Sequence, residues 1–339
     1  MNILQIVNPV MPIPPKAAGG IERIVYALCM ELLQLGHHVT LLAQDDSKLP
    51  SDIRFHPIGR YAEYQKTLKA VWKFMVQEGK SYDVIHNHGR LIYFLPRLWG
   101  HAAKVETFHG GELVVQNLKR WASLHPTHFT YVPCGDWITQ KFGSLGGRWK
   151  TVHNGLPKDL YTANMTLADD APLLIMARLG PAKGFSAAIR IARATGRRLW
   201  IAGRIGDYPH EKKWFEESVL KHCDGQQISY IGEIDDVQKQ KFISQSAAVL
   251  LPVEASEAFT VVMIEALACG TPVVGYNRYC LPELIQEGYN GFLANDEADM
   301  IEKVKRLPEL NRRNCRKDFE ERFTSRRMAE DYVRIYEEG

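Results

Sequence analysis

Short apolar runs alternate with amphipathic stretches along the first half of the chain. Residues 2–7 are largely apolar, 8–20 contain four prolines and end in Gly-Gly, 21–35 repeat apolar residues at helical spacing, and 39–43 are apolar again. This order predicts buried parallel strands connected by helices. The other elements predicted in this half are strands at 83–86, 103–108, 129–132 and 150–153, and helices at 64–77 and 136–142.

The same alternation starts again after a stretch without periodicity. Asn154-Gly155 marks a turn into 156–170, so we place a domain boundary after residue 155. Elements predicted beyond it are strands at 173–177, 199–202, 228–231, 247–252 and 273–275, and helices ending at 194 and spanning 214–222, 259–269, 300–307, 311–323 and 328–336. The pattern predicts an α/β chain of two Rossmann-like, doubly wound parallel-sheet domains, 1–155 and 156–324.

Two carboxylates frame the start of the helix predicted at 259–269. Glu257 lies in the loop after an apolar strand, at the sheet edge where such folds bind ligands, and Glu265 lies further along the helix. Between them, the N–H groups of four residues lack intrahelical acceptors and lie at the positive end of the helix dipole. These residues are Ala258, Phe259, Thr260 and Val261. A diphosphate bound there, with an acid on either side for sugar hydroxyls, is what a nucleotide-sugar requires.

The run from Glu257 through Glu265 to Ala268-Cys-Gly-Thr-Pro-Val-Val274 resembles the E-x7-E signature of family 4 retaining glycosyltransferases. The resemblance implies the GT-B fold, in which two Rossmann-like domains face a central cleft. The first domain would bind the acceptor and be completed by a last helix at about 325–339. The second, 156–324, would bind the donor.

A second motif follows the first strand of the second domain. Arg178-Leu-Gly-Pro-Ala-Lys183-Gly184 places two cations and flexible backbone directly after a strand, which favours a diphosphate clamp. It resembles the family's G/A-R-L-x-x-x-K-G element, so Arg178 and Lys183 carry over as diphosphate ligands. Glu257 would then hold the donor sugar's hydroxyls, and Glu265 those of the ribose.

Other positions resemble the family more loosely. Thr107-x-His109-Gly110 matches the donor-site histidine motif, which places His109 near the reacting carbon. Gly19 and Gly20 match a Gly-Gly-x-Glu opening, where backbone can approach a phosphate or sugar. Gly203 lies in a similar loop, and Ile234 corresponds to a residue bordering the base.

Two departures from the family pattern bear on the donor. Ala258 and Thr260 stand where glycine is common in the family, and the Thr260 hydroxyl would add a phosphate contact. Residues 278–281, Arg-Tyr-Cys-Leu, replace a glycine-rich turn before Pro282-Glu283. The base and the sugar therefore stay open, with UDP-sugars favoured because they are common donors in the family.

No metal and no cofactor are expected. His86 and His88 lack an identifiable carboxylate partner for a metal site, and no D-x-D motif occurs, so both histidines are interpreted as structural. No G-x-G-x-x-G follows either first strand, which disfavours a nicotinamide oxidoreductase. The six cysteines show no metal spacing and are expected to be reduced and mostly buried.

Charge and hydropathy limit the partners. The net charge is +3, and the first 155 residues carry 17 Lys and Arg against 11 Asp and Glu. Without a nucleic-acid motif, this balance does not predict nucleic-acid binding. The basic amphipathic helix at 64–77 is expected to pack on its sheet, with contact to anionic lipid as the alternative. Without a basic leader or a long apolar run, we expect a cytoplasmic protein, with peripheral attachment at the inner membrane face left open.

The expected activity is retaining, metal-independent transfer of a sugar from a nucleotide diphosphate donor to an acceptor hydroxyl. The acceptor would be a sugar, a lipid-linked sugar or a small molecule, in the biosynthesis of a glycan, glycolipid or glycosylated metabolite. Two alternatives remain: a GT-B epimerase or isomerase that needs no acceptor, and a non-catalytic nucleotide-sugar sensor.

Overall fold

The computed structural model describes residues 1–15, 19–110, 118, 121, 123–206 and 208–339. They form two compact units, Met1–Pro157 with Thr324–Gly339, and Lys158–Phe323. The sequence pattern divides the chain beside the same positions, after 155 and after 324.

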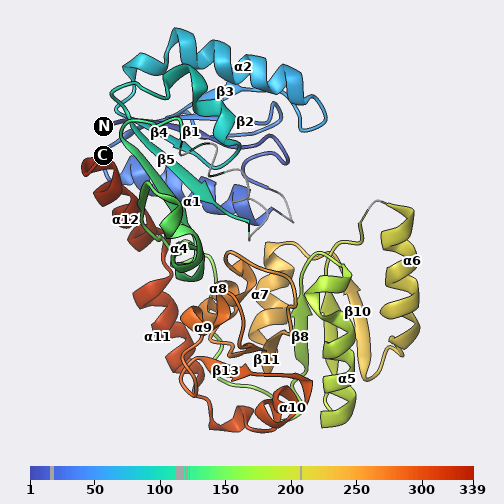
Figure 1. Ribbon diagram of the computed structural model, residues 1–339. Helices are drawn as coiled ribbons and strands as arrows, with labels where there is room; N and C mark the ends of the chain where they lie inside the picture. Colours follow the sequence, from blue (N-terminus) through green and yellow to red (C-terminus); the bar gives the residue numbers. More distant parts are fainter. Residues whose placement is uncertain (16–18, 111–117, 119–120, 122, 207) are drawn as a thin grey trace. The chain divides into compact units, whose positions relative to one another are not determined.

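Unit 1 is built on a parallel sheet with strand order β3-β2-β1-β4-β5-β6-β7 among the described residues (Figure 1). Its strands are β1 Asn2–Ile6, β2 His38–Ala43, β3 Ile53–Pro57, β4 Val84–Asn87, β5 Ala103–Phe108, β6 Phe129–Pro133 and β7 Arg148–Trp149. Strands β5 and β6 are buried along their whole length, because helices or loops cover both faces. The strand order reverses between β1 and β4, where the carboxyl ends of parallel strands favour a ligand site.

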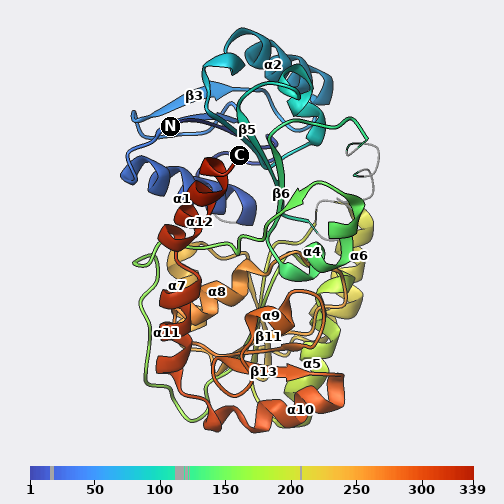
Figure 2. The same ribbon diagram turned by 60° about the vertical axis from the view of Figure 1, so that its left-hand side comes forward.

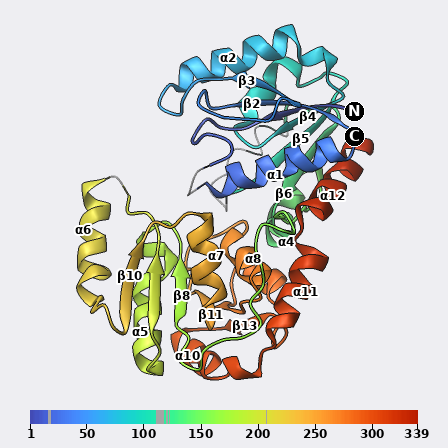
Figure 3. The same cartoon turned by 180° about the vertical axis from the view of Figure 1, so that it is seen from behind.

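Helices cover both faces of this sheet. Helix α1 (Gly20–Gln34) packs beside α12 (Ser325–Glu337) on one face, and α2 (Tyr64–Gln77) lies on the other (Figures 1 and 3). The bounds of α2 confirm the sequence prediction, and Val71, Phe74 and Met75 form its buried apolar face. The remaining helical segments of unit 1 are α4 Asp136–Phe142, η1 Gly79–Ser81, η2 Leu91–Arg97 and η4 Gly143–Leu145.

The predicted last strand of unit 1, 150–153, is wrong, because the observed strand begins two residues and ends four residues earlier. The strand that pairs with β6 is β7, Arg148–Trp149. The chain beyond it still follows β6, because the N–H groups of Lys150 and Val152 donate to the carbonyls of Tyr131 and Pro133. The predicted range therefore lies in a segment that runs alongside β6, and the paired strand β7 immediately precedes it.

Unit 2 has a second parallel sheet, with order β10-β9-β8-β11-β12-β13 among the described residues. Its strands are β8 Leu173–Met176, β9 Leu199–Ala202, β10 Ile228–Gly232, β11 Ala248–Leu251, β12 Val273–Tyr276 and β13 Gly291–Ala294. The order reverses between β8 and β11. Both switch points fit the predicted doubly wound fold.

Two helical layers cover the sheet of unit 2 (Figure 2). Helices α5 (Phe185–Thr195) and α10 (Glu297–Lys305) pack together on one face, and α8 (Val261–Ala268) and α11 (Arg312–Arg322) pack together on the other. The other helical segments are α6 Pro209–Ser218, α7 Asp236–Ser244, α9 Leu281–Leu284, η5 Pro181–Lys183, η6 Leu220–His222 and η7 Leu307–Glu309. Helix α6 begins five residues before the predicted 214.

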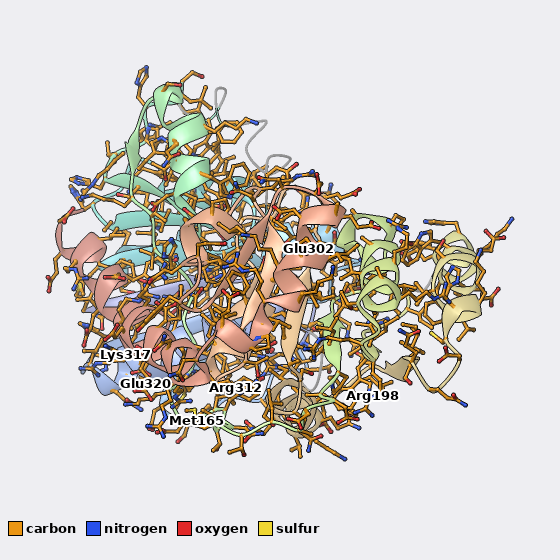
Figure 4. All side chains as sticks on the ribbon, turned by 90° about the horizontal axis from the view of Figure 1, so that it is seen from below. Met165, Arg198, Glu302, Arg312, Lys317 and Glu320 are labelled. Carbon is orange, nitrogen blue, oxygen red and sulfur yellow. The ribbon has the colours of Figure 1, made fainter. Side chains whose placement is uncertain are left out.

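A buried arginine ties α11 to the rest of unit 2. Arg312 (Figure 4) donates to the carbonyls of Asn164, Ser244 and Ser246 at 2.6–2.9 Å and to the Thr271 hydroxyl at 2.7 Å. Burial lowers the pKa of its guanidinium to about 10. Carbonyls left over at the ends of other elements are thereby satisfied by one side chain.

None of the six cysteines forms a disulfide, as the sequence predicted. Five of the thiols are buried, and Cys223 is partly exposed. Among the described residues, no helix combines the length and apolar character that a membrane crossing requires.

Candidate functional site

Two loops meet where the strand order of unit 2 reverses. The loop after β8 carries Arg178 and Lys183, and the loop after β11 carries Glu257. The N–H of Glu254 in the second loop donates to the carbonyl of Ala182 in the first at 3.1 Å. Gly184 has a positive φ of +78°, and a Cβ there would lie 2.0 Å from the carbonyl oxygen of Pro252. Only glycine allows this backbone contact, which holds the two motifs together.

Both predicted diphosphate ligands are paired with carboxylates. The Lys183 ammonium contacts Glu257 Oε1, and Arg178 Nη2 lies 2.7 Å from Glu211 Oε1 on α6. The Arg178 side chain is 65% exposed and that of Lys183 32%. The structure thus joins Lys183 to Glu257 as the motifs suggested. It adds Glu211, which lies before the helix predicted at 214–222 and was not predicted as a site residue.

The predicted anion site at the start of α8 has the expected local geometry. The helix begins at Val261, with Thr260 as an extended N-cap residue whose side chain makes no capping hydrogen bond. The N–H of Met263 donates to the Thr260 carbonyl at 3.0 Å, and the N–H groups that precede it at the helix start are the ones that lack an intrahelical acceptor. Thr260 and Val261 are partly exposed, whereas Ala258 and Phe259 are buried. The Thr260 hydroxyl lies 3.7 Å from the Cys280 thiol.

Glu265 is buried, with 1% of its surface exposed. Its Oε1 accepts hydrogen bonds from Lys239 Nζ at 2.8 Å and from the Tyr161 hydroxyl at 3.1 Å. Neither partner was predicted from the sequence, because Lys239 lies in a helix without an apolar stripe and Tyr161 in an aperiodic segment. A ribose at this carboxylate would share it with these two donors.

Two of the predicted donor contacts have a structural role within unit 2. Gly203 has φ +151°, and a Cβ there would lie 1.8 Å from the Ala177 carbonyl oxygen, so strand packing alone requires glycine. Ile234 is 4% exposed and contributes to the core. Their roles as ligand contacts stay predictions.

In unit 1, the predicted residues follow the ends of central strands and the start of α1. Gly19, with φ +128°, is the N-cap residue of α1, and Gly20 is its first residue. His109 directly follows β5, and its Nε2 lies 2.9 Å from His88 Nδ1. Burial lowers the pKa of His109 to about 4, so its imidazole is neutral at neutral pH. His88 was interpreted as structural, and the structure places it against the candidate histidine.

A polar cavity of about 500 Å³ lies at the opposite, amino edge of the unit 1 sheet. Asn2, Thr40, Arg54 and Tyr82 are among its lining residues, and it contains none of the predicted site residues. In doubly wound sheets ligands bind at the carboxyl edge, so we do not assign the site there.

Two family models match the two halves of the chain. Residues 18–158 match "Glycosyltransferase Family 4", and residues 164–325 match "Glycosyl transferases group 1". The chain belongs to the family 4 type of glycosyltransferase.

Curated relatives agree with this glycosyltransferase assignment. An uncharacterized glycosyltransferase of Methanocaldococcus jannaschii is 29% identical over 100% of this chain and 99% of its own length. N-acetyl-alpha-D-glucosaminyl L-malate synthase of Bacillus anthracis is 28% identical over 32% of this chain. The chain spans 30% of the length of that synthase and 45% of a 24% identical Klebsiella pneumoniae protein from a cps region.

Solved structures define the fold of this glycosyltransferase as GT-B. Sucrose-phosphate synthase from Thermosynechococcus elongatus superimposes with a TM-score of 0.80 at 18% identity, covering 100% of this chain and 99% of that one. Anabaena Alr3699/HepE in complex with UDP-glucose gives a TM-score of 0.76 at 15% identity, with full coverage of both chains. The predicted family and fold class are confirmed, and the matches support glycosyl transfer as the chemistry.

Proposed function

We propose that this chain transfers a sugar from a nucleotide diphosphate sugar to an acceptor hydroxyl, with retention at the anomeric carbon. The observation that carries the proposal is the junction at the unit 2 switch point. There the cationic loop after β8, the Glu257 loop after β11 and the start of α8 come together. UDP-sugars are the favoured donors, supported by the UDP-glucose complex of the structurally similar Anabaena protein.

Positive charge at this junction would act on the leaving diphosphate. As the glycosidic bond breaks, negative charge develops on the diphosphate oxygens, and groups already placed there lower the barrier. Arg178, Lys183 and the N–H groups at the α8 start are the groups assigned to this task. They require neither a metal nor a cofactor, so the proposed reaction uses none.

The two ion pairs define the resting state of the site. Lys183 contacts Glu257, and Arg178 contacts Glu211. A diphosphate carries more charge than a carboxylate and has more acceptor oxygens, so binding would exchange these contacts for phosphate contacts. Glu257 would then be released to accept hydrogen bonds from the donor sugar.

Attack by the acceptor would occur on the face from which the diphosphate leaves. Among the residues assigned to the site, none is placed as a nucleophile, so the acceptor hydroxyl would attack directly and pass its proton to the departing diphosphate oxygen. His109, as a neutral imidazole, would contact the donor sugar. The acceptor is a sugar, a lipid-linked sugar or a small molecule.

A nucleotide-sugar panel tests the proposal. One donor should raise the melting temperature specifically, because a ligand that binds only the folded state stabilises it. Nucleotide release should then require an added acceptor, and the product should keep the donor's anomeric configuration by NMR. Acceptor-independent conversion would instead indicate an epimerase, and specific binding without turnover would indicate a sensor.

A further inference from the structure

A row of polar side chains crosses four neighbouring strands at the carboxyl edge of unit 1. Gln5 lies near the end of β1, and His88, His109 and Cys134 directly follow β4, β5 and β6. His88 Nε2 lies 2.8 Å from Gln5 Oε1, and His88 Nδ1 lies 2.9 Å from His109 Nε2. His109 Nδ1 lies 3.6 Å from the Cys134 thiol. Gln5 is fully buried and His88 is 6% exposed, so water does not replace these contacts.

The amide of Gln5 determines which atom donates in each hydrogen bond of this row. Its oxygen faces His88, and its nitrogen faces the Tyr336 hydroxyl at 3.4 Å. An amide oxygen only accepts, so His88 Nε2 must carry a hydrogen. A neutral imidazole has one N–H, which leaves His88 Nδ1 as an acceptor. The hydrogen between the two rings therefore belongs to His109 Nε2.

Both rings are held neutral by their surroundings. Burial lowers the pKa of His88 well below 6.5, and the nearby His86 and His109 rings lower it further. Burial likewise lowers the pKa of His109. Each ring therefore carries a single N–H across the neutral pH range.

We propose that Gln5 and His88 are positioning residues that hold His109 in the tautomer protonated on Nε2, so that Nδ1 accepts a hydrogen bond from a ligand hydroxyl. The Cys134 thiol, a weak donor, is the present neighbour of Nδ1. It also lies 3.5 Å from Asn154 Oδ1, which gives it another acceptor when a ligand takes its place.

The inference rests on the proposed function and specifies which chemical group of the donor sugar contacts His109. An Nδ1 lone pair favours a group that carries a hydrogen and disfavours a phosphate or carboxylate oxygen. The ligand atom at His109 is therefore a neutral hydroxyl, as on an unmodified hexose, rather than the carboxylate of a uronic acid.

Long-range ¹H–¹⁵N correlation spectra of the full chain, labelled with ¹⁵N-histidine, test the tautomer directly. A His109→Gln variant assigns the signals. At neutral pH, His109 should show a protonated Nε2 and an unprotonated Nδ1; the opposite pattern would overturn the inference. The measurement uses no substrate, so its failure is distinct from a failure of donor binding.

Two variants test the part played by Gln5. Gln5→Met removes the acceptor at similar volume; it should give a mixture of His109 tautomers and lower kcat/KM by roughly tenfold, the value of one buried hydrogen bond. Tyr82→Phe is the matched control, since it removes a buried hydroxyl that donates to the Thr40 hydroxyl at 3.0 Å at the opposite, amino edge of the same sheet. An unchanged tautomer in Gln5→Met, or an equal change in Tyr82→Phe, would exclude Gln5 as the determinant. If Gln5→Met does not fold, the spectrum of the unaltered chain still decides the tautomer.

Discussion

Lys183 and Glu257 are 74 residues apart in the sequence and meet because β8 and β11 are neighbours in the sheet. The sequence identified both residues, since each stands in a recognisable motif directly after an apolar strand. It could not identify Glu211 as the partner of Arg178, because that contact depends on how α6 is placed. His88 was likewise assigned a structural role, since no local pattern connects it to His109. Residue types near strand ends are thus predictable, whereas their partners require the tertiary structure.

Removing the Lys183 ammonium should abolish most transfer without unfolding the chain. Lys183→Ala takes away charge aimed at the leaving diphosphate, and loss of one such group typically costs about 100- to 1,000-fold in kcat. Steady-state kinetics with the donor found in the panel measure the effect. Lys213→Ala is the control, since that side chain is 74% exposed on α6. Full turnover by Lys183→Ala would contradict the assigned role.

Glu211→Gln should tighten donor binding. Glu211 pairs with Arg178, and its Oε2 accepts from the Tyr208 N–H at 3.2 Å at the start of α6. Glutamine keeps the second contact but removes the charge that competes for Arg178. Because an exposed ion pair is worth up to about 1 kcal/mol, the Kd should fall by up to about fivefold. Calorimetric titration would show weaker binding if Glu211 instead orients Arg178 for the ligand.

Elements with a periodic apolar face were predicted well. The predicted bounds of α2 and α4 agree with the structure. Helix α7 was missed because only Ile243 and Ser244 of its residues are buried, so no apolar stripe marks it. The sequence feature that marks its start is a capping box. The Asp235 side chain accepts a hydrogen bond from the backbone N–H of Gln238, and the Gln238 side chain accepts one from the backbone N–H of Asp235. Strand β3 was missed for a related reason, since Ile53 alone is buried in it.

Helix α11 should depend on its buried arginine more than on its surface charges. Arg312→Met leaves the acceptors of Arg312 unsatisfied in the interior, so unfolding should become easier by roughly 3–5 kcal/mol. The neighbouring Arg313 is exposed, and Arg313→Met should change stability by less than about 0.5 kcal/mol. Urea unfolding followed by circular dichroism measures both. Equal effects of the two substitutions would refute a clamp at Arg312.

For the whole molecule, the two units should respond differently to acid. Burial lowers the pKa values of His86 and His88 well below 6.5 and that of His109 to about 4. The unfolded chain therefore binds more protons than the folded unit 1 below pH 6.5, and stability falls as pH drops toward 4. Each imidazole contributes up to about 1.4 kcal/mol per pH unit. Glu22 and Glu106 act in the opposite direction, because burial raises the pKa of each carboxyl, but they are two groups against these three imidazoles.

Hydrogen exchange read peptide by peptide separates the units. Unit 2 contains only His210 and His222, and both are exposed or nearly so. Between pH 7 and pH 5, protection should fall in β1, β4 and β5 while changing little in β8 and β11. A uniform loss over both sheets, after correction for intrinsic exchange rates, would show that the buried histidines do not govern acid stability.

Because five of the six thiols are buried, the rate at which each one is modified reports how often the structure around it opens. With a reagent that reacts only with solvated sulfur, the partly exposed Cys223 should react first, and the other five should react only after local opening. Cys29 and Cys134 would time the opening of one unit, and Cys269, Cys280 and Cys315 that of the other. The opening rates of the two units can therefore be compared in a single sample, without any introduced label.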